Sequence, residues 1–128
     1  MHARASFDYA LLRVVPRVER QEFINAGVVV YCPEKRFLAA RVRLDRARLL
    51  ALWPEVDVAL IEKHLAAIER ICAGDLEAGP IAKLSQRERF HWLTSPRSTI
   101  VQPSPVHTGV CDETGALLDR LEKQFLSS

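Results

Sequence analysis

The stretch that decides the fold is AGVVVYCPEKRFLAARVRL, residues 26–44. Its first part, 26–32, is an apolar run rich in valine, and its last part, 37–44, alternates apolar with basic side chains. Both patterns are typical of β-strands. The four residues PEKR between them are enough to join two antiparallel strands. The stretch therefore predicts a β-hairpin in which Cys32 lies opposite Phe37.

This register assigns each side chain of the hairpin to one of two sheet faces. The first face is predicted to be core, because it carries only apolar side chains and a glycine: Gly27, Val29, Tyr31, Leu38, Ala40 and Val42. The second face mixes apolar side chains with arginine and is expected to be partly exposed to water: Val28, Val30, Ala39, Arg41 and Arg43. Arg13 joins Arg41 and Arg43 there if the preceding strand pairs in the matching register.

The segments around the hairpin predict one more central strand and a set of helices. FDYALLRVV, residues 7–15, is apolar on both faces except at Asp8 and Arg13, as a central strand requires. The predicted helices are a short one after Asp45, a longer one at about 58–73 between Asp57 and Gly74, a short one behind a capping box of Ser85 and Glu88, and a last one from about Thr114. We expect an α+β fold, in which a small, mostly antiparallel sheet of three to four strands packs against helices.

The length and composition fit one globular domain over residues 1–128, with 1–6 as a flexible extension. The longest apolar run is far shorter than the roughly 20 residues that cross a bilayer, and the first residues do not resemble a secretion signal. Three cysteines without a paired spacing favour reduced thiols, with Cys32 and Cys72 in the core. We therefore expect a cytoplasmic protein that does not enter a membrane.

Positive charge is concentrated in the first part of the chain. The net charge is only +2, but residues 1–50 carry ten lysines and arginines against five acidic residues. Such an excess usually marks a solvated face, and the alternative is a surface that meets an anion or an acidic partner.

A second unusual stretch is SPRSTIVQPSPVHTG, residues 95–109. Only 98–102 is predicted to be a strand, at a sheet edge, because Pro103 and Pro105 cannot donate to a sheet ladder. The hydrogen-bonding side chains of the stretch are Arg97, Ser98, Thr99, Gln102, Ser104, His107 and Thr108. They form either a stiff recognition loop for a polar or anionic partner, or a loop that satisfies its own backbone. Arg97 is the strongest binding candidate, because its planar guanidinium can hold a carboxylate or phosphate with two hydrogen bonds.

Nothing in the sequence predicts catalysis. Ser104, His107 and Asp112 supply the residue types of a hydrolase triad, but the Gly-x-Ser-x-Gly turn is missing. His107 and Cys111 have a spacing that could bind zinc with His64 or His91, but no second ligand pair accompanies them. The residues favour a protein without catalytic residues, metal or cofactor.

FDYALLRVVPRVERQEFINAGVVVYCPEKRFLAARV, followed downstream by SPRSTIVQPSPVHTG, resembles the bacterial family known as domain of unknown function 3037. The resemblance extends from about Phe7 to the last predicted helix. The family has no established activity, so the resemblance assigns no catalytic residue. It implies another protein, a HipA-like kinase, as partner.

Two functions remain open. The first is a non-enzymatic binding or regulatory module that uses the 95–109 loop and the basic sheet face. The alternative is a nucleic-acid or nucleotide-phosphate binder that uses Arg13, Arg41, Arg43 and Arg97 against phosphates. The basic residues lack the aromatic interleaving typical of single-strand readers, which favours the first function.

Overall fold

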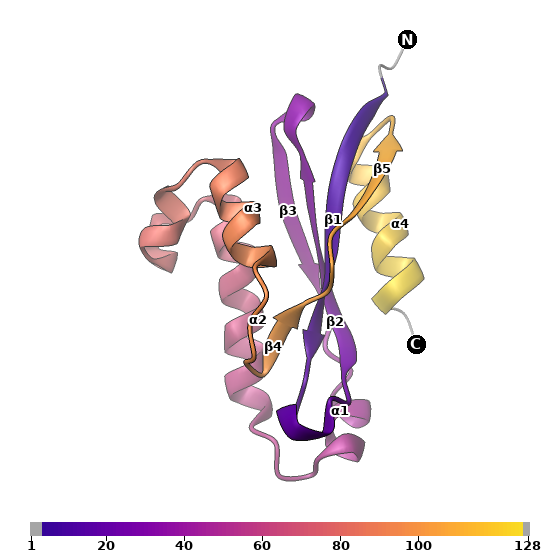
Figure 1. The fold of residues 1–128 in the computed structure, drawn as a ribbon, viewed down its shortest axis with the longest axis vertical. Coiled ribbons are helices and arrows are strands. Elements are labelled where there is room, and N and C mark those ends of the chain that lie inside the picture. Colours follow the sequence, from indigo (N-terminus) through magenta and orange to yellow (C-terminus); the bar gives the residue numbers. More distant parts are fainter. Residues whose placement is uncertain (1–3, 127–128) are drawn as a thin grey trace.

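The computed structural model describes residues 4–126 and places one sheet between two helical layers (Figure 1). The strands are β1 Ala5–Val14, β2 Ile24–Cys32, β3 Phe37–Val42, β4 Val101–Pro103 and β5 His107–Cys111. The helices of the described range are α1 Arg46–Leu52, α2 Val58–Ala73, α3 Gln86–Thr94 and α4 Thr114–Leu126. In Figure 1, α2 and α3 lie on one side of the sheet and α4 on the other. The fold is α+β, as predicted.

The sheet is antiparallel and has the order β3-β2-β1-β4, with β5 also paired to β1. β4 pairs with one half of β1 and β5 with the other half, so together they form a broken edge strand. The sheet therefore has five strands, which is more than the three to four expected from the sequence.

The hairpin of β2 and β3 has the predicted register, with Cys32 opposite Phe37 and Gly27 opposite Val42. A short 3-10 turn, Pro33–Lys35, joins the strands, and Arg36 closes it with a left-handed backbone at φ 50°. The predicted register is thus confirmed, and a slip by one residue would have paired side chains of the first face with side chains of the second.

The first hairpin face is core, as predicted. Val29 is fully buried, and it belongs to a cluster that includes Leu12 of β1 and Ile71 of α2. α2 has the predicted bounds, and its caps are those in the sequence: the Asp57 side chain accepts from the backbone at its start, and Gly74 ends it at φ 76°. The spacing of apolar residues along α2 thus identified both the helix and the face that it covers.

The sequence did not predict how the end of α2 is held. Arg89 of α3 is 9% exposed, and its Nη1 donates to the carbonyls of Ile71 and Cys72 at 2.8 Å each. Its Nε donates to Leu84 O at 3.0 Å. A charged donor at a helix C-terminus satisfies carbonyls that have no partner within the helix. Arg89 therefore joins α2 and α3 into one layer.

The second face is partly exposed, as predicted, since Ala39 and Arg41 are half-buried and Arg43 is exposed, but its central part is covered. Val28 and Val30 are fully buried, because the apolar stripe of α4, including Leu117 and Leu121, packs on them. Arg41 lies at the margin of this contact, and its Nη1 is 2.9 Å from carboxylates of Asp119 and Glu122 on α4. Hydrogen bonds to these carboxylates, the one to Glu122 first, raise the pKa of Arg41. Arg41 is thus paired within the protein.

The N-terminal strand begins earlier than predicted. Ala5 and Ser6, expected in a flexible extension, belong to β1 and lie opposite Cys111 and Val110 of β5. Of the expected extension, residues 1–3 lie outside the described residues. The error arose because β5, the strand that pairs with Ala5 and Ser6, was not predicted.

The edge strand also differs from the predicted strand at 98–102. β4 contains Pro103, which an edge position tolerates because one side of the strand needs no donors. β5 was missed because its glycine and polar residues are typical of a loop. Gly109 lies against Phe7, and a Cβ there would come within 2.7 Å of the Phe7 Cζ. The glycine makes room for an aromatic ring to pack across the strand.

Candidate functional site

The break between β4 and β5 is built on Ser104. The Ser104 N–H donates to Leu11 O at 2.8 Å, and its Oγ accepts from Leu11 N at 2.8 Å and donates to Pro105 O at 2.9 Å. Between the paired positions, three edge residues lie opposite two residues of β1, which is the geometry of a bulge. Ser104 is 3% exposed and so has a structural role; it is not an accessible nucleophile.

His107 and Thr108 lie on β5, beyond this break. The His107 ring is 5.3 Å from the Tyr9 ring, and Thr108 Oγ1 donates to Asp8 at 2.9 Å. Both residues are exposed, whereas Ser104 is buried, so the three do not form a shared pocket. Within residues 4–126, no three His, Cys, Asp or Glu side chains are grouped so that they could hold a metal ion.

Three of the predicted binding residues meet at a cleft of about 300 Å³ between α2, α3 and the segment leading into β4. Arg97, Thr99 and Gln102 border it, together with His64 of α2, which sequence reasoning placed only among possible metal ligands. Its lining is otherwise mainly apolar: Leu12, Ala67, Ile68, Ile71, Leu93, Ile100 and Val101. Ser98 is exposed and does not line the cleft. The 95–109 stretch therefore contributes one wall of a mainly apolar cleft.

Arg97 is less free than the sequence suggested. Its Nε donates to Ser95 O at 3.3 Å and its Nη2 donates to Trp92 O, so the guanidinium binds carbonyls at the end of α3. The Arg97 Cζ also lies 4.7 Å from the centre of the Trp92 ring, in a cation–π contact. The Arg97 guanidinium thus has partners within the protein, and an anion bound there as predicted would compete with the two carbonyls.

Trp92 borders the cleft, although sequence reasoning did not name it as a candidate site residue. Its neighbour Phe90 is 7% exposed, but Trp92 is 38% exposed. Trp92 borders the cleft and also a second hollow, whose other lining residues are Leu84, Arg87, Glu88, His91 and Ser95. The sequence did contain one sign that Trp92 is exposed: it lies among polar residues on a short helix, which is unusual for an aromatic residue of the core. Trp92 is the wall shared by both hollows.

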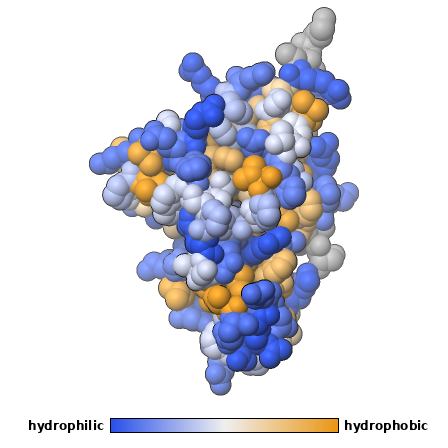
Figure 2. Space-filling view, viewed as in Figure 1, coloured by the Kyte–Doolittle hydropathy of each residue, from blue (hydrophilic) through white to orange (hydrophobic). Residues whose placement is uncertain are grey.

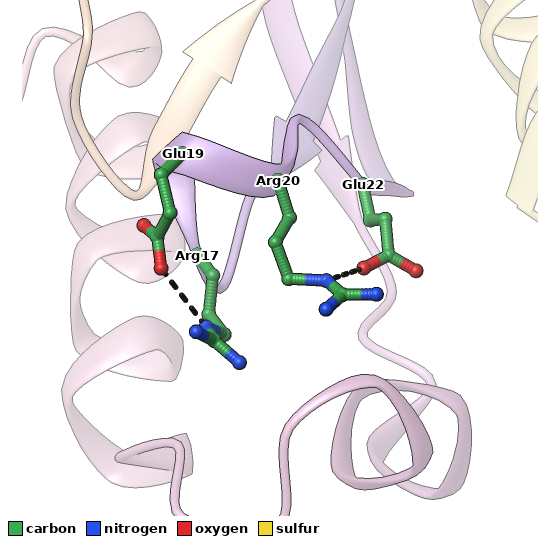
Figure 3. Close-up of polar contacts among 4 residues, drawn as sticks. All are labelled: Arg17, Glu19, Arg20 and Glu22. Carbon is green, nitrogen blue, oxygen red and sulfur yellow. Dashed lines mark hydrogen bonds and ion pairs between the residues drawn. The ribbon is translucent and has the colours of Figure 1, made fainter.

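Much of the basic excess near the N-terminus is neutralised locally. In the β1–β2 loop, Arg17 pairs with Glu19 at 3.0 Å and Arg20 pairs with Glu22 (Figure 3). Elsewhere Arg46 pairs with Glu62 at 2.6 Å. Arg41 is also paired, so these four arginines are less available to phosphates than the sequence alone suggests.

Arg13 and Arg43 lie away from the cleft. By strand pairing, Arg13 is opposite Asn25 on one side and Gln102 on the other, on the α4 side of the sheet. Arg43 follows β3 and donates its backbone N–H to Ala26 O at 2.8 Å. Arg13 and Arg43 therefore do not line the cleft that Arg97 and Thr99 border.

The fold and this surface define a class: a small α+β protein with a five-stranded sheet between two helical layers and an apolar cleft beside an exposed tryptophan. The chain belongs to the family described as "Protein of unknown function (DUF3037)", which matches residues 9–126 and confirms the resemblance seen in the sequence. Neither the curated proteins nor the solved structures contain a match to it. Between residues 4 and 126, no helix is long and apolar enough to span a bilayer.

Proposed function

We propose that this protein is a non-enzymatic binding module, acting in the cytoplasm, that docks a partner protein at the cleft beside Trp92. The observation that carries the proposal is the position of Trp92, a partly exposed aromatic shared by two adjacent hollows. Tryptophan and arginine are the residue types most often found at the energetic centre of protein interfaces, and here Arg97 stacks on Trp92. The stacked pair is therefore the expected anchor.

The lining of the two hollows suggests the chemistry of the partner. The cleft floor accepts apolar side chains, and its margin carries Arg97 and His64. The second hollow adds Arg87 and His91, while the Glu88 carboxylate is held by Ser85 in the capping box. This supports a partner segment that presents an apolar side chain flanked by carboxylates.

The distribution of apolar side chains over the surface supports a compact contact. On the face seen in Figure 2, apolar side chains lie in small patches separated by hydrophilic ones. A small docking site of this kind suits a regulatory contact better than a permanent, largely apolar interface. The family resemblance makes a HipA-like kinase the first partner to test.

Nucleic-acid or nucleotide-phosphate binding has less support. Arg41 is paired with carboxylates of α4, and Arg97 is bound to backbone carbonyls. Phosphate recognition would have to break these contacts before it gained new ones. If such binding existed, its affinity would fall steeply as salt is raised, whereas docking through the apolar cleft would change little.

The test is the affinity of a purified HipA-like kinase from the same organism for the protein and for two variants. Trp92→Ala removes the anchor, and we expect about a 30-fold weaker complex, since hot-spot truncations cost about 2 kcal/mol or more. Leu76→Ala is the matched control, because Leu76 is an apolar side chain, 63% exposed, that lines neither hollow. It should bind as the unchanged protein does.

Thermal melting of each variant accompanies the titrations, so that lost affinity is not confused with lost folding. A folded Trp92→Ala protein that binds the kinase as well as before would contradict docking at the cleft. Failure of the unchanged protein to bind the kinase would remove this partner. Docking at the cleft would then have to show as capture of a cell protein that Trp92→Ala abolishes and Leu76→Ala preserves.

A further inference from the structure

One wall of the cleft, the segment that leads into β4, has three successive backbone carbonyls that already accept hydrogen bonds. Thr99 O accepts from the side-chain amide of Gln102 at 2.7 Å. Ile100 O accepts from the backbone N–H of Val15 at 2.7 Å. Val101 O accepts from Thr99 Oγ1, also at 2.7 Å. These carbonyls are therefore used within the protein.

This wall is poorly suited to binding a partner as an added strand. A strand that extends a sheet is held by backbone donors and acceptors that alternate along the edge. Along β4 the Val101 carbonyl is bonded by a neighbouring hydroxyl, and Pro103 has no N–H to donate. The wall therefore offers a partner its side chains more than its backbone.

The other walls of the cleft are α2 and α3, which lie beside β4 in Figure 1. Backbone groups inside a helix are bonded within it, but its last carbonyls have no such partner. At the end of α3, Ser95 Oγ donates to His91 O at 2.7 Å. The Arg97 guanidinium donates to Trp92 O. The helical walls, too, meet a ligand mainly with side chains.

A bound segment therefore has to satisfy most of its own backbone. The lining of the cleft is mainly apolar. An extended segment pressed into such a lining leaves backbone N–H and C=O groups without partners, which weakens binding. A helix bonds its own backbone groups and presents only side chains to the lining.

The length of the cleft also suits a helix. The α2 residues that line it are His64, Ala67, Ile68 and Ile71. They cover two turns, which is about 10 Å along the helix axis. Side chains at positions i and i+4 of a bound helix are about 6 Å apart along its axis and lie on the same face. Two apolar side chains one turn apart therefore fit this length.

We infer that the segment docked at the Trp92 cleft is an amphipathic α-helix, with apolar side chains one turn apart and acidic side chains beside them. The apolar side chains enter the cleft, and the acidic ones face Arg87 in the second hollow, which Trp92 also borders. The inference rests on the function proposed for the cleft, and it adds the conformation and the pattern of the partner segment.

The test uses two libraries of short peptides displayed on phage, with the same randomised positions and the same number of glutamates. One frame is rich in alanine and forms a helix, whereas the other carries prolines throughout, which exclude a helix. Each library is selected on the unchanged protein, and clones that also bind Trp92→Ala are discarded. We expect the remaining clones, which need the cleft, to come from the helical frame.

A proline substitution then tests the bound conformation of a selected peptide. Proline in the middle of the peptide should weaken binding about 100-fold, because it breaks a helix. Proline at the first position, which a helix tolerates, is the matched control and should leave the affinity unchanged. If thermal melting shows that Trp92→Ala is unfolded, Ala67→Lys takes its place, since it puts a charged side chain into the cleft.

The outcomes separate the inference from the function on which it rests. Clones that need the cleft but come from the proline frame would overturn the helix while leaving docking at the cleft in place. A central proline that leaves the affinity unchanged would do the same. If neither frame yields a clone that needs the cleft, docking there is contradicted, and the inference falls with it.

Discussion

Helices pack on both faces of the sheet, but the residues at the margin of each packed region, where the helices no longer cover the sheet, differ between the two faces. On the α2 and α3 side, apolar packing continues into a cleft whose arginine, Arg97, is already bound to carbonyls. On the α4 side, apolar packing stops where α4 ends, and Arg13 and Asn25 keep unpaired polar atoms beyond it. The first margin is a mainly apolar cleft, whereas the second ends in polar side chains.

The difference shows that counting arginines does not locate a binding surface. The basic residues of the hairpin and of the 95–109 stretch looked alike in the sequence, but their partners decide what they can do. Arg41 is paired with α4, Arg97 holds α3 and Trp92, and Arg13 alone of these three keeps a buried donor without a partner.

The largest expected effect is on the rate at which the cysteine thiols under the two faces react with an alkylating reagent. Cys72 lies under the α2 side, and burial raises its pKa to about 12. Cys32 and Cys111 lie under α4, and burial also raises the pKa of Cys111. At pH 8, the thiolate of Cys72 should be about a thousandfold scarcer than that of a free cysteine, so alkylation should be slower by a similar factor.

Mass spectrometry after iodoacetamide treatment, with and without urea, measures all three rates. We expect the native protein to react slowly at every cysteine and the unfolded protein to react at all of them. Rapid native labelling of Cys32 and Cys111 with Cys72 protected would contradict the equal burial of the two faces, because it would mean that α4 detaches.

The next effect compares the packing of the two helical layers. Leu65 of α2 is 2% exposed and Leu121 of α4 is 4% exposed. Replacing either by alanine should lower the free energy of unfolding by about 2–5 kcal/mol, measured by urea denaturation. Leu60→Ala, at a side chain 46% exposed on α2, is the control and should change it by no more than about 0.5 kcal/mol. A small effect at Leu121 alone would show that the α4 face is not a true core.

The sequence predicts those features that depend on interactions between residues close together in the chain. The hairpin register and α2 depend on local periodicity and capping, so the alternation of 26–44 and the spacing of α2 were sufficient. The packing of α4 on the second face was not predicted, because Arg41 bonds to residues of α4 that are 78 and 81 positions away in the chain. β5 was missed because the reason for Gly109 is a ring on another strand.

The candidate site was predictable only in part, for the same reason. Arg97, Thr99 and Gln102 were named from one stretch and do meet at the cleft, but its floor comes from α2 and β1. Ser104 was predicted to be a binding residue of the loop, but it is buried and bonded to the backbone of Leu11, 93 positions away. No local pattern carries that information.

A smaller effect on stability is expected from a change at Ser104, which lies at the break between β4 and β5. Ser104→Ala leaves the buried Leu11 N–H without its partner and should cost about 1–3 kcal/mol of unfolding free energy. Ser98→Ala, at an exposed serine of the same stretch, is the matched control and should be nearly neutral. Equal melting temperatures for the two variants would rule out the structural role of Ser104.

The smallest effect concerns the ion pairs at the rim of α4. The Arg41 side chain is 37% exposed, so Arg41→Gln should cost no more than about 1 kcal/mol, and less in high salt. Urea denaturation at low and high salt measures this. A loss of several kcal/mol that salt does not reduce would mean that Arg41 is a buried anchor of α4.

The most direct test of the account is a hydrogen-exchange comparison of the protein alone and in complex with the HipA-like kinase. Docking at the cleft predicts protection in α3 and in the segment up to Pro103, which carry Trp92 and Arg97, with exchange on α4 unchanged. Protection that instead falls on α4 or near Arg13 would contradict docking at the cleft.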